Sequence, residues 1–175
     1  PGGVGKSTFA NLITDAAHPL ADVPVKYVES IGVESYTLQR PGDASEVELV
    51  VPPGQQHRRA DSWPGLLRDL QDGRFRGVIL FSAFGHHALG EISYKSSALY
   101  AEHGKKKAAF LQAFLEKCRN DELQVVDDLA AHLKLCSNPI WMLSIVTKQD
   151  LWWKDRATVE NHYQSGPYSA IINGV

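Results

Sequence analysis

The first eight residues constrain this chain more than any other segment. They read Pro-Gly-Gly-Val-Gly-Lys-Ser-Thr and hold the second half of the pattern G-x-x-x-x-G-K-[ST], whose first glycine would precede Pro1. Such a loop needs glycines because its backbone N–H groups turn inward around phosphate oxygens, with φ values and a closeness of approach that side chains forbid. Residues 7–17 follow with Phe9, Leu12 and Ile13 at helical spacing. The pattern therefore predicts a phosphate-binding loop at the start of a helix.

Each residue type in this loop has a chemical role. Lys6 is expected to contact the β- and γ-phosphates of a nucleotide and so to act in catalysis, and the Ser7 hydroxyl is expected to bind Mg²⁺. The helix N-terminus adds its positive dipole end to the anion site. The expected nucleotide-binding residues of the loop are Gly2, Gly3, Val4, Gly5, Lys6, Ser7 and Thr8. A chance glycine-rich turn is the alternative, and the amphipathic segment that follows argues against it.

A second candidate site follows an apolar run, 140–146, that is expected to be a buried strand. The run closes with Thr147-Lys148-Gln149-Asp150, at the strand end where α/β sheets bind ligands. These four residues resemble the [NT]-K-x-D guanine motif of translation-factor-like GTPases. The resemblance gives Asp150 the hydrogen bonds from the guanine ring N–H and exocyclic amine. It implies that Lys148 packs along the base and that Thr147 ties this loop to the phosphate site.

The segment Ser30-Ile31-Gly32-Val33-Glu34 looks like switch I of Arf-like GTPases. The resemblance places Ser30 as a ligand of Mg²⁺ and a contact of the γ-phosphate. Thr37 is an alternative ligand, although we expect it inside a strand. The segment is short, so the resemblance depends on its place ahead of a predicted hairpin.

Residues 51–55 occupy the place of the D-x-x-G-Q motif of switch II, and they depart from it. The resemblance implies that Gly54 offers its N–H to the γ-phosphate and that Gln55 is catalytic, orienting the attacking water. Val51 stands where the family has an aspartate that holds Mg²⁺ through water. Because the metal neutralises charge on the β- and γ-oxygens, we expect weak Mg²⁺ binding and slow or partner-stimulated hydrolysis.

Short apolar runs alternate with helical stretches, a pattern typical of α/β proteins. With 175 residues, 43% of them hydrophobic and 22% charged, the chain has the size of one domain. Strands are expected at 31–39, 46–51, 77–82 and 140–146, the first two as a hairpin, and helices at 7–17, 62–72, 107–117, 121–135 and 155–164. Residues 85–120 are expected to hold an insertion or an extended loop-helix region.

Taken together, the motifs resemble a Ras- or Arf-like G domain. The resemblance implies a P-loop NTPase three-layer sandwich with a mostly parallel sheet and one antiparallel hairpin strand, of which the first strand and the C-terminal end are expected to lie outside the chain. The implied function is a molecular switch that binds GTP or GDP with Mg²⁺ and contacts a regulatory or effector protein.

Charge, hydrophobicity and cysteine content indicate which partners and which cellular compartment to expect. The net charge of -2 and a single basic run, 105–107, do not predict a nucleic-acid partner, and the sequence has no apolar run long enough for a membrane span. Cys118 and Cys136 lack metal-ligand spacing, which favours a reducing, cytoplasmic compartment.

Two other interpretations remain open. The glycine loop also resembles those of ParA/MinD-type ATPases and of signalling ATPases with a nucleotide-binding switch, but those families expect an acidic residue at the end of a later strand, and neither 47–51 nor 78–82 ends in one. Val51 supports a pseudo-GTPase that serves as an interaction module of a larger protein.

Three dipeptides have less specific interpretations. His86-His87 is expected to be a satisfied polar loop because no metal-ligand partner lies at a suitable spacing. Arg58-Arg59 is expected to be a solvated charge pair. Of Trp152-Trp153, one residue is expected to pack under the base loop, and exposure of the other would indicate an interface.

Overall fold

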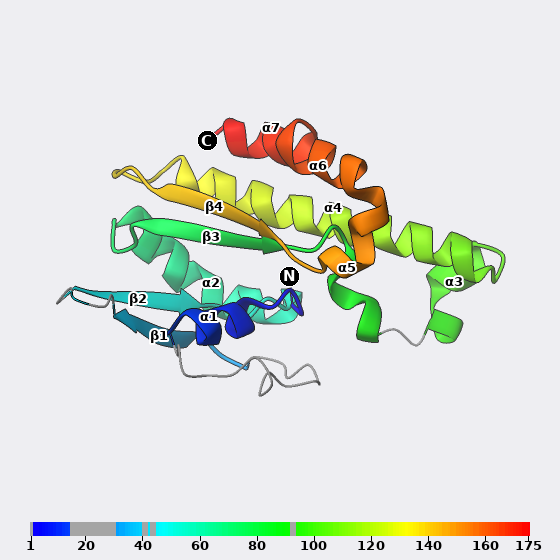
Figure 1. Ribbon diagram of the computed structural model, residues 1–175, viewed down its shortest axis with the longest axis horizontal. Coiled ribbons are helices and arrows are strands. Elements are labelled where there is room, and N and C mark those ends of the chain that lie inside the picture. The colour runs from blue at the N-terminus through cyan, green and yellow to red at the C-terminus, as the bar shows by residue number, and fades with distance from the viewer. Residues whose placement is uncertain (1, 15–30, 40–41, 43–44, 92–93) are drawn as a thin grey trace. The chain divides into compact units, whose positions relative to one another are not determined.

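A computed structural model describes residues 2–14, 31–39, 42, 45–91 and 94–175 of the chain (Figure 1). The chain divides into two compact units, Gly2–Leu66 and Leu67–Val175, called here the N-terminal and C-terminal units. Helix α2, Gln56–Gln71, runs across their boundary. The single domain expected from the sequence stays a prediction.

The N-terminal unit consists of helix α1 (Lys6–Thr14), the strands β1 (Glu34–Gln39) and β2 (Glu46–Val51), and the first part of α2. The strands pair as the expected antiparallel hairpin, with Glu34 opposite Val51 and Gln39 opposite Glu46. Strand β1 begins three residues later than the expected residue 31. Its alternate residues are half-buried and exposed, as a strand with one covered face requires.

Helix α2 begins at Gln56, six residues before the start expected from hydrophobic spacing. Its first turns are polar and are held by hydrogen bonds that periodicity does not reveal. The Ser62 hydroxyl donates to the Arg58 carbonyl at 2.9 Å, and Pro64 lies inside the helix. A proline there removes one backbone hydrogen bond from the helix.

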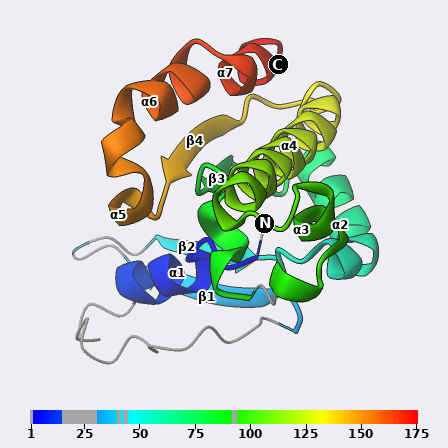
Figure 2. The ribbon, with the colours of Figure 1, turned by 90° about the vertical axis from the view of Figure 1, so that its right-hand side faces the viewer.

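The C-terminal unit is built on two parallel strands, β3 (Gly77–Ser82) and β4 (Trp141–Val146), paired in register from Gly77 with Trp141 to Ser82 with Val146. Between them lie η2 (His86–Glu91), η3 (Tyr94–Ser96), α3 (Ala98–Glu102) and α4 (Lys107–Leu133). After β4 come α5 (Gln149–Trp152), η4 (Trp153–Asp155), α6 (Arg156–Gln164) and α7 (Pro167–Asn173). Helix α7 packs beside both α4 and α6 (Figure 2).

Three expectations for this unit need correction. Helices 107–117 and 121–135 are one continuous helix, α4, because residues 118–120 contain neither proline nor glycine. Strand β4 is not buried on both faces, since Trp141 is 56% exposed. The sequence analysis did not expect α7, which starts with a proline at its first position.

A hydrophobic cluster joins α2, α4 and the two strands of the C-terminal unit. Its buried members are Leu70, Leu129 and Leu133, and the half-buried side chains packed on it include Val78, Leu80 and Met142. The strands are thereby fixed against α4, and their carboxyl ends come to one edge.

The described residues thus contain two separate two-stranded sheets, one in each unit. The single, mostly parallel sheet of a P-loop sandwich stays a prediction. No helix in the described part of the chain is long and apolar enough to cross a membrane.

Candidate functional site

The loop before α1 has the backbone conformation that glycine permits. Gly3 and Gly5 have φ values of 69° and 86°, in the left-handed region. A Cβ on Gly5 would meet no atom within 4 Å, so the dihedral angle rather than crowding favours glycine there. The Phe9 N–H donates to the Gly5 carbonyl at 2.9 Å, so the helix begins directly at the loop. Lys6 and Ser7 therefore occupy the first turn of α1, a position that favours bound anions.

The remaining residues of the loop differ in exposure. Val4 is buried, Gly2 and Gly3 are half-buried, and Gly5 and Thr8 are exposed. The expected phosphate-binding residues are thus continuous along one short loop and helix start. Their contact with a nucleotide stays a prediction.

A carboxylate that the sequence analysis did not assign lies beside Ser7. The Ser7 hydroxyl donates to Glu34 Oε2 at 2.7 Å, and the Tyr36 hydroxyl donates to the same oxygen at 2.9 Å. Glu34 and Tyr36 are two residues apart on β1, so their side chains leave the same face of the strand. Their alternation was the available signal, but Glu34 was considered only as the end of the segment resembling switch I.

Lys6 shares this environment. Burial lowers the pKa of its ammonium from 10.5 to about 8, with smaller effects from Glu34, which raises the pKa, and Arg59, which lowers it. A bound phosphate would add negative charge near Lys6 and favour its charged form. The Lys6 ammonium, the Ser7 hydroxyl and the Glu34 carboxylate therefore share one environment within the N-terminal unit.

The residues expected for switch I do not all belong to this group. Ser30 lies outside the described residues. Thr37 is described, but it lies on the exposed face of β1, opposite to the face that carries Glu34 and Tyr36. Thr37 as an alternative Mg²⁺ ligand beside Ser7 is therefore wrong.

The segment resembling switch II follows β2. Val51 is only 5% exposed, and its apolar side chain cannot replace an acidic group that holds a metal. Gly54 is buried, and its carbonyl accepts a hydrogen bond from Arg59 Nε at 3.2 Å. Gln55 is half-buried and directly precedes α2. The roles of the Gly54 N–H and the Gln55 side chain stay predictions.

Two arginines at the start of α2 bind the backbone of the segments that resemble switch I and switch II. Arg58 Nη1 donates to the Ile31 carbonyl at 3.0 Å, and Arg59 bonds the Gly54 carbonyl. The guanidinium of Arg59 also lies over the Trp63 ring, 5.6 Å from its centroid. The expectation of a merely solvated charge pair is wrong, because backbone groups hold both side chains.

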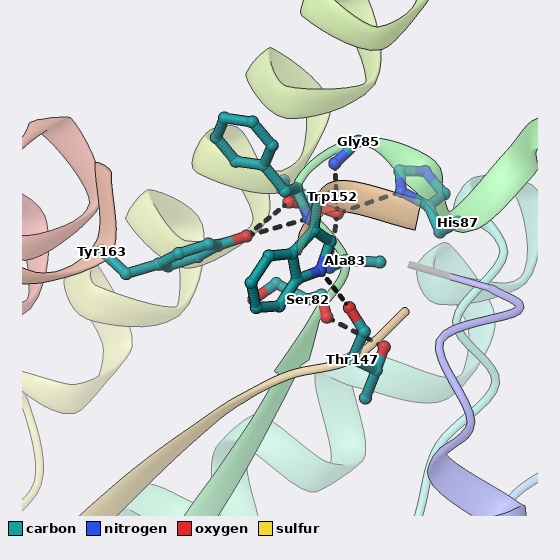
Figure 3. Close-up of polar contacts among 9 residues, drawn as sticks. Ser82, Ala83, Gly85, His87, Thr147, Trp152 and Tyr163 are labelled. Carbon is teal, nitrogen blue, oxygen red and sulfur yellow. Dashed lines mark hydrogen bonds and ion pairs between the residues drawn. The ribbon is translucent and has the colours of Figure 1, made fainter. Parts of the chain in front are cut away.

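In the C-terminal unit, the loop after β4 is bound to the end of β3 (Figure 3). The Thr147 N–H and hydroxyl both donate to the Ser82 carbonyl, at 2.8 and 3.1 Å, and Trp152 Nε1 donates to the Thr147 carbonyl at 2.6 Å. Lys148 has a left-handed φ of 59° and precedes α5, whose first turn contains Asp150. Lys148 and Asp150 are exposed, and a ligand can reach them.

The two tryptophans after this loop behave as the sequence predicts. Trp152 is buried with Phe84 and Val159 under the loop. Trp153 is 51% exposed, and the Arg156 guanidinium lies over its ring, 5.2 Å from the centroid. Trp152 therefore supports the loop, while Trp153 faces solvent.

A buried carboxylate from α4 fixes the loop that follows β3. Glu122 is 1% exposed, and its Oε1 accepts the N–H groups of Ala83 and Gly85 at 3.0 and 3.2 Å (Figure 3). His87 Nδ1 lies 3.1 Å from the same oxygen, and the Tyr163 hydroxyl donates to Oε2 at 3.1 Å. Sequence analysis missed Glu122 and Tyr163 because both lie far along the chain from the loop.

The electrostatics of Glu122 agree with this arrangement. Burial alone would raise its pKa, but hydrogen bonds from His87 and from the backbone of Ala83 and Gly85 outweigh burial and leave the pKa below its usual value. The loop it holds is unusual, since Phe84 and Gly85 have φ values of 50° and 82°. A Cβ on Gly85 would lie 2.4 Å from the Leu115 carbonyl oxygen, so only glycine fits.

This arrangement bears on the two histidines. His87 contacts Glu122, in agreement with a satisfied polar loop. His86 Nδ1 is buried without a hydrogen-bond partner in the part of the chain that the structure describes, so the expectation is wrong for His86. Within the described residues, no group of three or more histidine, cysteine, aspartate or glutamate side chains is suited to hold a metal ion.

The two parts of the expected nucleotide site fall in different units. The phosphate loop and Glu34 belong to the N-terminal unit, whereas residues 147–150 belong to the C-terminal unit. Comparison of the chain with protein-family models, with curated proteins and with solved structures finds no match.

Proposed function

We propose that this protein binds GTP and GDP with Mg²⁺ and acts as a molecular switch with slow or partner-stimulated hydrolysis. The observation that carries the proposal is the backbone of residues 2–5. Gly3 and Gly5 are left-handed and lead directly into α1, which places Lys6 and Ser7 in its first turn. This combination of conformation and residue types is what phosphate binding by a glycine loop requires.

Guanine selectivity is proposed from the loop after β4. Asp150 is exposed in the first turn of α5, and the loop before it is held by the Thr147 bonds to β3. A carboxylate accepts hydrogen bonds from the two donors of the guanine edge, the ring N–H and the exocyclic amine. Lys148, exposed beside it, would pack along the base.

The donors near the phosphate loop also fit Mg²⁺, which prefers oxygen ligands and is commonly bound with substrate phosphates. Ser7 offers a hydroxyl oxygen, and Glu34 is a carboxylate bonded to that hydroxyl. When bound, the metal would neutralise charge on the β- and γ-phosphate oxygens. Val51 lacks the carboxylate of the switch II pattern, so we propose a slow intrinsic reaction that uses Lys6 and Gln55.

The proposed setting is the cytoplasm, with a regulatory or effector protein as partner and without nucleic acid. Exposed Trp153 supports a protein contact, since exposed aromatic residues are enriched at interfaces.

The test is a titration with fluorescent GTP and ATP analogues in Mg²⁺ buffer. Wild type should prefer GTP, Lys6→Ala should lose phosphate contacts and binding to either nucleotide, and Asp150→Ala should lose the preference for GTP. Asp155→Asn, a nearby exposed carboxylate change, is the matched control and should bind as wild type does.

Asp150→Asn sharpens the assignment of the base loop. Xanthine has a carbonyl where guanine has its exocyclic amine, and an asparagine NH₂ group can donate to that carbonyl. Asp150→Asn should therefore shift the preference from GTP to XTP. Preference of the wild type for ATP would refute the guanine assignment, and absence of binding to any nucleotide would favour a pseudo-GTPase.

A further inference from the structure

We propose that Glu34 is the carboxylate that positions Ser7 for Mg²⁺, in place of the aspartate that Val51 replaces. This inference rests on the proposed function. It concerns a positioning residue, which acts through the Ser7 hydroxyl rather than through the phosphates themselves.

The first step is the hydrogen bond between Ser7 and Glu34. A serine hydroxyl has one proton to donate and lone pairs with which to accept. The Ser7 hydroxyl donates this proton to Glu34 Oε2, and the two oxygens are 2.7 Å apart. Lone pairs of the hydroxyl oxygen are then directed away from the carboxylate, which is the orientation that a cation ligand needs. Removing a group that is bonded to a metal ligand in this way typically lowers metal affinity by about 10- to 100-fold.

The second step is the position of Glu34 in the hairpin. Glu34 is the direct cross-strand partner of Val51. Side chains of directly opposed residues lie on the same face of an antiparallel pair, about 4.5–5.5 Å apart at their Cβ atoms. The switch II pattern has a carboxylate at the position of Val51. In this chain the carboxylate of Glu34 lies directly opposite that position, on the same face of the hairpin.

The third step is the orientation of Glu34 itself. The Tyr36 hydroxyl donates to Oε2 at 2.9 Å, so the oxygen that accepts from Ser7 is held from a second side. Both hydroxyls converge on one atom, and this restricts the rotation of the carboxylate.

The experiment compares the affinity for a fluorescent GDP analogue in excess MgCl₂ and in excess EDTA. Glu34→Gln keeps an oxygen that can accept from Ser7 but removes the charge that strengthens this bond, so we expect the gain in affinity with Mg²⁺ to fall by about 10- to 100-fold. In EDTA the variant should bind as wild type does. Mn²⁺ bound in the GDP complex, measured by electron paramagnetic resonance, should show the same weakening without any hydrolysis. Glu48→Gln is the control, because Glu48 is exposed in the same hairpin.

Two further variants separate positioning from folding. Tyr36→Phe keeps the bond between Ser7 and Glu34 and should lose a smaller part of the Mg²⁺ gain. Adding Val51→Asp to Glu34→Gln should restore part of that gain, because the carboxylate returns on the opposite strand. Circular dichroism identifies variants that fail to fold. If Glu34→Gln is one of them, Tyr36→Phe tests the inference by itself.

The opposing outcomes are distinct. An unchanged Mg²⁺ gain in Glu34→Gln would overturn the inference and leave GTP binding intact. Tighter binding of Glu34→Gln both in EDTA and in MgCl₂ would also overturn it, because Glu34 would then compete with phosphate for Lys6 and Ser7. Absence of nucleotide binding by the wild type would refute the proposed function together with this inference.

Discussion

Each unit of the protein contains a carboxylate held by a tyrosine, but the two carboxylates have different surroundings. Glu34 is half-buried and accepts hydrogen bonds from the hydroxyls of Ser7 and Tyr36. Glu122 is 1% exposed and accepts from two backbone N–H groups and the Tyr163 hydroxyl, with His87 also in contact.

The different hydrogen-bond donors around Glu34 and Glu122 indicate different roles for the two carboxylates. Backbone donors can be satisfied only by an acceptor at a fixed place, so a buried carboxylate that receives them determines the path of the chain. Hydroxyl donors can rotate toward water or a ligand. Glu122 therefore has the surroundings of a residue that stabilises the fold, and those of Glu34 are compatible with the proposed Mg²⁺ site.

Glu122→Ala is expected to have the largest effect on the stability of the fold. The substitution leaves the N–H groups of Ala83 and Gly85 buried without their acceptor, which costs about 1–3 kcal/mol for each group. We expect the free energy of unfolding to fall by roughly 3–5 kcal/mol. Urea unfolding followed by tryptophan fluorescence measures it, with exposed Glu116→Ala on the same helix as the control. A loss no larger than that of the control would break the comparison.

The acid stability of the protein should depend on Glu122. Its pKa is lower in the folded state than the ordinary 4.5, so the unfolded chain takes up a proton first as the pH falls. The contribution of Glu122 is therefore complete above about pH 4.5 and is lost progressively below it as the folded pKa is approached. The slope of stability against pH in this acid range should be smaller in Glu122→Gln, and an equal slope would assign acid sensitivity to other groups.

Sequence reasoning found the elements whose cause is local. The strands 46–51 and 77–82 were predicted at the bounds they have, and the hairpin followed from a turn cluster between alternating segments. The expected starts of α2 and β1 were wrong, because the first turns of α2 are polar and residues 31–33 do not pair.

The candidate site divides in the same way. The loop proposed to bind phosphate could be predicted from a motif, because the residues of that motif are consecutive in the sequence. Glu34 lies 27 residues from Ser7, and Glu122 lies 39 residues from Ala83. The packing of α1 against β1, and of α4 against the segment after β3, brings those groups together, and neither contact can be predicted from residue spacing.

The two tyrosines allow a comparison with a smaller effect. The Tyr163 hydroxyl donates to Glu122 and also accepts the Phe84 N–H at 3.1 Å, so Tyr163→Phe leaves two buried partners unsatisfied. We expect the free energy of unfolding to fall by about 1–3 kcal/mol in Tyr163→Phe. In Tyr36→Phe it should fall by under about 1 kcal/mol, because the Tyr36 hydroxyl is only partly buried. Thermal unfolding of the nucleotide-free protein measures both, and the opposite ranking would contradict the division of roles.

The smallest effect should come from Glu34→Gln, and the same change at residue 122 is its matched partner. A glutamine at residue 34 keeps one carbonyl oxygen, which can accept from both Ser7 and Tyr36, so we expect less than about 1 kcal/mol of destabilisation. At residue 122 both oxygens accept hydrogen bonds, and an NH₂ group in either place would face a donor. Thermal unfolding without nucleotide compares the two variants directly. A larger loss at residue 34 would mean that its carboxylate holds β1 to α1, and weaker Mg²⁺ binding in that variant would then reflect damage to the fold.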